Sequence, residues 1–178
     1  MTARQILIGS FFLIPLTLLQ SQELPPAQDG FHWQRAPEIK GAFLVPDRWH
    51  FKMEKEGATI GYFVTRENTD SGSFLVGLTA NIIPKLKSYD AVAYMNAFMQ
   101  KLPEGKTIRE RWDVSRGPLV GKGLLFEDDQ AVMHELALAN PKTNTLYLFM
   151  FEAPLSEWDD AWQLGKKIMD TLVIDDEM

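Results

Sequence analysis

The spacing of apolar residues along the chain switches between a period of two and a period of three to four. Runs with a period of two, or with apolar residues on both sides, are typical of strands. They occupy residues 41–45, 50–55, 58–67, 74–83, 107–114, 116–123, 131–139 and 146–153. Turn signals such as Pro46-Asp47 and Asn140-Pro141 separate several of these runs, and the second of them begins a hairpin. The chain is therefore predicted to be rich in short strands.

Two segments have helical spacing instead. In residues 88–102 the apolar residues recur every three or four positions, at Ala91, Met95, Phe98 and Leu102, and Ser88 is the expected N-cap. The second segment starts at Ser156, which has Asp159 three residues later in the pattern of a capping box. Its apolar stripe comprises Trp158, Ala161, Trp162, Gly165, Ile168, Met169 and Leu172. Both segments are predicted to be amphipathic helices.

The run at 146–153 is apolar on both of its faces. Leu146, Leu148 and Met150 form one row, and Tyr147, Phe149 and Phe151 form the other. The run at 74–83 has the same character, so both are expected to be central strands that are covered on each side. Because Trp158 and Trp162 belong to the apolar stripe of the next helix, we expect these aromatics to form core, with a ligand pocket as the alternative.

From about Phe43 to Ile174, the chain resembles the PsbP-like group of domains. The resemblance rests on "FLVPDRW", on the strands ending in "GLTANIIP", on the helix after Ser88 and on the closing "LYLFMFEAPLSEWDDAWQLGKKIMDTL". It implies an α+β fold in which an antiparallel β-sheet is packed between helices. Members of the group act in interactions more often than in catalysis, which implies a binding or assembly role. No binding motif of the group can be matched residue by residue.

The amino terminus has the order of a secretory signal peptide. One cation, Arg4, precedes an apolar run from Ile6 to Leu19 and then the polar "QSQE". A helix of about 14 residues spans roughly 21 Å, which is less than the roughly 30 Å of a bilayer core. We therefore expect a signal peptide over residues 1–21, a linker over 22–30 and one domain over 31–178, without a membrane span after processing. The expected location is periplasmic or secreted.

Composition excludes several classes of site and partner. The 178 residues contain no cysteine, which rules out disulfides, thiolate nucleophiles and iron–sulfur clusters. The formal net charge of −6 leaves no diffuse positive field for nucleic acid. No phosphate-binding loop, dinucleotide motif or nucleophile motif is present. We therefore expect no cofactor and no catalytic motif.

Histidines do not form a metal-binding pattern, because His32, His50 and His134 lie in separate segments. His134 alternates with apolar residues, so it is predicted to be a hydrogen-bonded core histidine rather than a ligand. His50 follows Trp49 just after a turn and is the better surface candidate. No metal site is therefore expected.

Basic residues suggest one further surface. Ile108, Trp112 and Val114 are expected to share one face of their strand, with Arg109 and Arg111 on the other. Together with Arg116 and Lys122 these arginines form either a basic strip or an exposed face with cross-strand ion pairs.

Two hypotheses for function remain. The first is an exported, non-catalytic module that binds a protein or small ligand in the cell envelope. Its candidate contact residues are Trp49, His50, Arg109 and Arg111, on the side away from the last helix. The second is a hydrolase whose site is built from dispersed acidic residues and His50.

Overall fold

A computed structural model describes residues 24–101 and 105–174. The predicted signal peptide over residues 1–21 lies outside the described residues, and so does Leu102. Nine strands are described: β1 (Phe31–Ala36), β2 (Gly41–Pro46), β3 (His50–Glu56), β4 (Thr59–Thr65), β5 (Gly77–Ile83), β6 (Thr107–Arg116), β7 (Leu119–Glu127), β8 (Ala131–Asn140) and β9 (Thr145–Pro154). Two α-helices, α1 (Ala91–Gln100) and α2 (Trp158–Thr171), and the short 3-10 turns Pro37–Ile39, Thr69–Ser71 and Leu155–Glu157 complete these elements.

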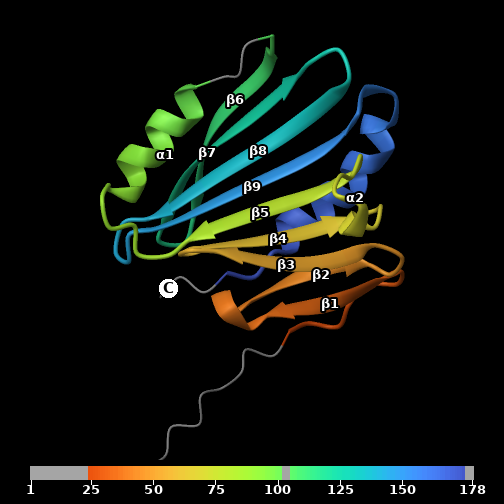
Figure 1. Cartoon of the computed structure of the whole chain (residues 1–178), viewed down its shortest axis with the longest axis horizontal. Coiled ribbons are helices and arrows are strands. Elements are labelled where there is room, and N and C mark those ends of the chain that lie inside the picture. Colours follow the sequence, from red (N-terminus) through yellow and green to blue (C-terminus); the bar gives the residue numbers. More distant parts are fainter. Residues whose placement is uncertain (1–23, 102–104, 175–178) are drawn as a thin grey trace, which may run out of the picture.

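Seven strands form one antiparallel sheet in the order β3-β4-β5-β9-β8-β7-β6 (Figure 1). The remaining two strands form the separate hairpin β1-β2. α1 packs on β7, β8 and β9, whereas α2 contacts β9 and β2 from the other side of the sheet. The predicted α+β class, with an antiparallel sheet between helices, is confirmed.

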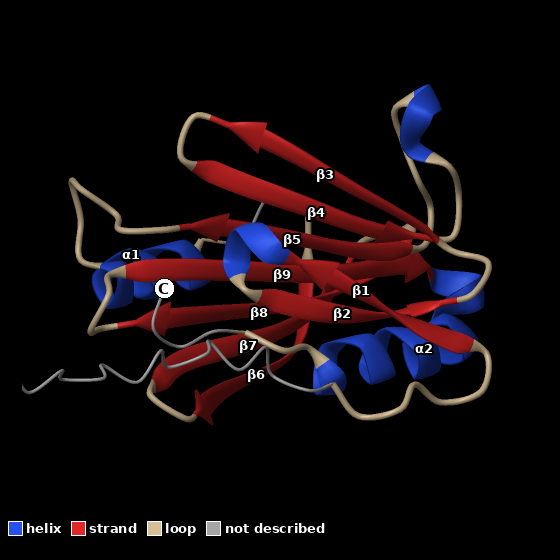
Figure 2. Cartoon of the chain, turned by 90° about the horizontal axis from the view of Figure 1, so that it is seen from below, coloured by secondary structure: helices blue, strands red, loops and turns tan. Residues whose placement is uncertain are grey.

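One side of the sheet, here called the α2 face, is covered by α2 and by the β1-β2 hairpin, which lie next to each other in Figure 2. Each strand supplies alternate residues to this core, as the pleat requires. The central rows are Ile60, Tyr62 and Val64 of β4, Leu78, Ala80 and Ile82 of β5, and Tyr147, Phe149 and Phe151 of β9. The hydrophobic core is therefore concentrated between β9, α2 and the hairpin.

The aromatic residues of the closing segment belong to this core, as predicted. The rings of Trp158 and Trp162 stack with centroids 5.3 Å apart, and Trp162 lies 5.6 Å from the ring of Phe151. Gly165 allows the close approach of α2, because a Cβ atom at this position would lie 2.6 Å from the Phe151 ring. The expected spacing of the α2 stripe thus produces a tightly packed helix–sheet contact.

The opposite side of the sheet, here called the α1 face, has a smaller core. Ala91, Met95 and Met99 of α1 pack there against residues of β7, β8 and β9, namely Leu124, Phe126, Met133, Ala137, Ala139 and Leu146. α1 is ten residues long and does not extend over β4 and β5, both of which are seen unobstructed in Figure 1. The prediction that both faces of residues 74–83 are covered is therefore wrong, because only Ile83 of β5 packs against the α1 core.

Neither predicted N-cap forms in the structure. Asp90, not Ser88, caps α1 by accepting a hydrogen bond from the Ala93 amide at 2.8 Å. Asn144, from the β8–β9 turn, accepts a hydrogen bond from the Ala91 amide at 2.7 Å and so positions the start of the helix. Ser156 lies in the 3-10 turn before α2, and the N-cap position of α2 makes no side-chain cap bond.

A β-bulge in β6 changes which residues share a face. The register with β7 shifts between Ile108 and Glu110, so that Ile108 lies opposite Phe126 while Trp112 lies opposite Gly123. Phe126 belongs to the α1 face, whereas the Trp112 ring lies over Gly123 on the α2 face. The prediction that Ile108 and Trp112 share one face is wrong, because a bulge inserts one residue into a strict alternation.

Candidate functional site

The four candidate contact residues lie at opposite edges of the sheet. Trp49 and His50 stand at the start of β3, and Arg109 and Arg111 lie on β6. Since β3 and β6 are the two edge strands, these residues do not form the single contact surface that was predicted. Trp49 also lies on the α2 side, not away from the last helix, because its ring stacks on Phe151 with centroids 6.4 Å apart.

Trp49 lines a cavity of about 210 Å³, which we call the Trp49 pocket. The cavity lies between the turn before β3, the connection of β4 to β5 and the first turns of α2. Its lining residues are Trp49, Arg66, Val76, Ser156, Glu157, Asp160, Ala161 and Leu164. The floor is therefore apolar and the rim polar, which is the usual character of a binding pocket.

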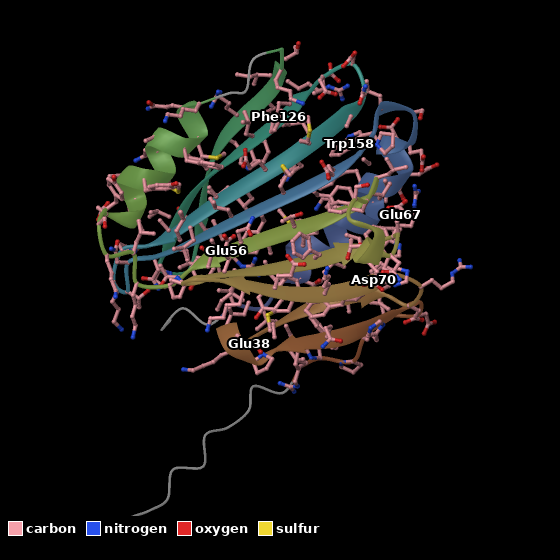
Figure 3. All side chains as sticks on the ribbon, viewed as in Figure 1. Glu38, Glu56, Glu67, Asp70, Phe126 and Trp158 are labelled. Carbon is pink, nitrogen blue, oxygen red and sulfur yellow. The ribbon has the colours of Figure 1, made fainter. Side chains whose placement is uncertain are left out.

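Charged side chains hold the rim of the Trp49 pocket together. Arg66 donates hydrogen bonds to Glu67 at 2.8 Å and to Glu157 at 2.5 Å, and so ties the end of β4 to the start of α2. Glu67 also accepts hydrogen bonds from the Leu75 and Val76 amides at 3.0 and 3.1 Å. Burial alone would raise the pKa of Glu67, but these hydrogen bonds lower it below its usual value. Glu67 and Asp70 lie toward the same end of the molecule as Trp158 in Figure 3.

Two large aliphatic side chains flank the Trp49 pocket. Leu75 is 62% exposed and Leu155 is 40% exposed, and each is the neighbour in sequence of a pocket residue, Val76 or Ser156. Scattered exposed leucines are common on protein surfaces and need no explanation. Here each exposed leucine precedes a lining residue of the Trp49 pocket in the chain.

The arginines of β6 are engaged in structural contacts. Arg109 pairs with Glu127 on the neighbouring strand β7, and Lys122 of β7 pairs with Asp113 at 2.8 Å. Arg111 donates to the Met99 carbonyl oxygen at the end of α1 at 2.6 Å. Arg116 likewise donates to a backbone carbonyl oxygen, that of Leu172 after α2. Cross-strand ion pairs therefore form at Arg109 and Lys122, whereas Arg111 and Arg116 bind backbone oxygens instead.

A second cavity, of about 280 Å³, lies beside Arg111. Its lining residues are Met99, Gln100, Arg111, Trp112, Asp113, Lys122 and Gly123. Both positive charges in it are already paired with a carbonyl or a carboxylate. It therefore offers little free charge for an anion.

None of the three histidines lines either of these two cavities. His50 is exposed, and His32 pairs with Asp47 at 3.3 Å. His134 packs between the rings of Trp112 and Trp162, at centroid distances of 5.0 and 4.3 Å. Burial lowers its pKa to about 4, and its buried Nδ1 atom has no hydrogen-bond partner. His134 thus packs against the aromatic rings of the α2 face as a half-buried residue, and its Nδ1 atom does not make the predicted hydrogen bond.

Two carboxylates on the α1 face did not stand out in the sequence. Glu135 of β8 pairs in register with Met150, and Glu152 of β9 pairs with Met133, so the two carboxylates are diagonal neighbours. Burial raises the pKa of Glu135 to about 7 and also raises the pKa of Glu152. The sign of these two residues in the sequence was that each one interrupts an otherwise apolar row. Glu135 interrupts the row of β8 in its middle, and Glu152 interrupts the row of β9 at its end.

The described part of the chain offers neither a metal-binding cluster nor a spanning helix. Within residues 24–101 and 105–174, no group of three or more histidine or acidic side chains is placed to hold a metal ion. No helix in these two ranges has both the length and the apolar character needed to cross a bilayer.

Comparison with known proteins shows similarity of fold without close similarity of sequence. No protein family matches the chain, and no curated protein matches it by sequence. The solution structure of cyanobacterial PsbP (CyanoP) from Synechocystis sp. PCC 6803 aligns with a TM-score of 0.53 at 13% identity, covering 85% of this chain and 95% of that chain. The Ran-binding protein Mog1p of Saccharomyces cerevisiae aligns with a TM-score of 0.50 at 11% identity, covering 81% and 95%. The resemblance to PsbP-like domains is thereby confirmed at the level of the fold.

Proposed function

We propose that this chain is an exported, non-catalytic binding module of the cell envelope or secreted space, and that it contacts a protein partner through the Trp49 pocket. The observation that carries the proposal is the pocket itself: an aromatic floor, a charged rim and two exposed leucines beside it. The pattern of residues 1–21 supports export. One protein of similar fold is a Ran-binding protein, which is consistent with a fold that serves protein recognition.

The chemistry of the Trp49 pocket indicates what a partner presents. A cavity of about 210 Å³ with an apolar floor suits one or two apolar side chains. Arg66 pairs with two carboxylates, Glu67 and Glu157, and Asp160 adds a further negative charge, so the rim is negatively charged. A partner segment with an apolar anchor and a neighbouring lysine or arginine therefore complements this surface.

Affinity capture from the native envelope fraction tests this proposal. Leu75→Asp and Asp160→Lys alter exposed positions around the pocket, so the variants should stay folded while partner retention falls by at least about tenfold, the effect of losing a central contact. Lys142→Glu, in the β8–β9 turn at the other end of β9, is the matched control and should keep the partner. Equal retention by all three variants would exclude the Trp49 pocket as the contact surface.

The arginines of the β6 edge are tested separately. A combined Arg109→Ala and Arg111→Ala variant should keep the Trp49 pocket intact, because β6 and β3 are opposite edges of the sheet. A loss of partner in this variant alone would move the contact surface to the β6 edge.

A hydrolase is the competing function. Catalysis requires an acid or base within hydrogen-bond reach of a substrate-sized cleft, and no histidine lines either of the two cavities described above. Glu135 is the acidic residue best suited to proton transfer, because its pKa is raised to about 7. Turnover of a substrate from a hydrolase panel, abolished by His50→Ala or Glu135→Gln in folded protein, would replace the binding proposal.

A further inference from the structure

The α1 face of the sheet is only half covered. α1 packs over β7, β8 and the near side of β9, which leaves β4, β5 and the far side of β9 without a helix (Figure 1). Neighbouring strands lie about 4.8 Å apart, so the distance from β4 to β9 is about 10 Å. This width matches the diameter of one α-helix, about 10 Å.

The side chains of this uncovered half are of mixed character. Half-buried residues line it from three strands: Phe63 of β4, Thr79 and Asn81 of β5, and Leu148 and Met150 of β9. Gly61 and Gly77 add two positions without side chains. The surface is therefore partly apolar, and a helix can pack on it as α2 packs on the other face.

Glu135 and Glu152 stand at the border between α1 and the uncovered half. Neither carboxylate makes a hydrogen bond or a direct ion pair with another side chain of residues 24–101 and 105–174. Leaving a desolvated carboxylate without a partner costs stability, and natural proteins keep such groups chiefly where function requires them. The described part of the chain therefore provides no cation that pairs directly with either carboxylate.

The groups packed around these carboxylates leave their negative charge uncompensated. α1 contains no charged residue in its ten positions. On β7, Lys122 pairs with Asp113 of β6, and Arg111 of β6 donates to the Met99 carbonyl oxygen. Lys106 attracts Glu152 electrostatically but forms its ion pair with Asp128. On β3, Lys52 pairs with Glu54.

We propose that the uncovered half of the α1 face is the docking surface for an amphipathic helix of a protein partner, and that a lysine or arginine of this helix pairs with Glu135 and Glu152. Charge complementarity favours a cationic helix, because the surface offers two unpaired carboxylates. A second copy of this chain is a poor partner, because two chains of net charge −6 repel each other. The apolar residues of the helix pack on Phe63, Leu148 and Met150. The proposal does not depend on the Trp49 pocket, which lies on the other face.

Site-specific photocrosslinking in cells tests the docking. A photoreactive phenylalanine at Thr79 should crosslink to a protein, and mass spectrometry of the adduct should identify a segment with lysine or arginine and apolar residues at helical spacing. The same group at Lys142, in the β8–β9 turn, is the control and should not give this adduct. No adduct at Thr79, an adduct with lipid or with a second copy, or an adduct with an acidic segment would overturn the proposal.

Glu135→Gln tests the charge pairing with a synthetic peptide of the crosslinked segment. Titration calorimetry should show binding at least about tenfold weaker for Glu135→Gln, as expected when one partner of a desolvated ion pair is removed. For the unsubstituted protein, affinity should rise as the pH increases through about 7, and binding at pH 7 should release protons, because the cation binds the ionised form of Glu135.

Two further measurements separate loss of binding from loss of folding. A melting temperature of Glu135→Gln that is equal to or higher than that of the unsubstituted protein would show that its weaker binding does not reflect an unfolded protein. Thr79→Arg should also abolish binding, since it places bulk and positive charge on the docking surface. Affinity that is independent of pH and unchanged in Glu135→Gln would overturn the pairing even if a helix docks.

Discussion

Replacing Glu135 by glutamine should make the protein more stable at pH 8. Glutamine has nearly the shape of glutamate but carries no charge, so the substitution removes the desolvated charge and keeps the packing beside Met150. A folded-state pKa of about 7, compared with an ordinary value of 4.5, corresponds to about 3 kcal/mol at 1.36 kcal/mol per pKa unit. The half-buried position admits some water, so we expect a gain of about 1–3 kcal/mol in the free energy of unfolding.

The sign of the pH dependence follows from the raised pKa. The folded protein binds the Glu135 proton more tightly than the unfolded chain does. The corresponding stability is therefore fully present below about pH 4.5 and is lost as the pH rises through about 7. The difference between Glu135→Gln and the unsubstituted protein should be small at pH 5 and should reach its maximum by pH 8.

Urea denaturation at pH 5, 6, 7 and 8 measures this difference directly. Glu54→Gln is the matched control, because Glu54 is an exposed residue paired with Lys52 and its removal should change the free energy of unfolding by less than about 1 kcal/mol. A difference that does not vary with pH, or a Glu135→Gln variant that is less stable at pH 8, would refute the reasoning. Either result would mean that the Glu135 carboxylate is solvated or paired in solution.

Three other predictions concern the core, the half-buried histidine and export. Trp162→Ala should lower the free energy of unfolding by about 3–5 kcal/mol in urea, because the ring contacts His134, Phe151 and Trp158, and a loss below about 1 kcal/mol would contradict its core position. The lowered pKa of His134 means that its stability contribution is present above about pH 6.5 and is lost as the pH falls through about 4, so His134→Phe should lose less stability than the unsubstituted protein between pH 7 and pH 4. Intact-mass analysis of the natively expressed protein should find about the first 20 residues missing, and a chain that still begins at Met1 and fractionates with membranes would instead favour an anchor.

The candidate sites were less predictable than the elements. Trp49 was a candidate contact residue because it is an aromatic residue beside a turn, and it does line a pocket. Its neighbours there, Arg66 and Asp160, come from distant segments and gave no signal in the sequence. Glu135 and Glu152 appeared as polar interruptions of apolar rows, but their burial depends on strand pairing and on the position of α1. Sequence patterns therefore indicated single candidate residues. They did not indicate which other residues lie beside each candidate in the folded protein.

The sequence by itself determined both helices, most of the strands and the aromatic rows that enter the core, but its pattern did not predict β1 (Phe31–Ala36). Periodicity is a local property, and a chain that must bury apolar side chains places Tyr147, Phe149 and Phe151 on one side wherever the strand lies. Only the tertiary structure decided the order of the strands, since β5 pairs with β9 across a long sequence separation. That order sends Trp49 and Arg111 to opposite edges of the sheet. It also leaves half of the α1 face uncovered, because whether a ten-residue helix spans a sheet depends on the number of strands beneath it.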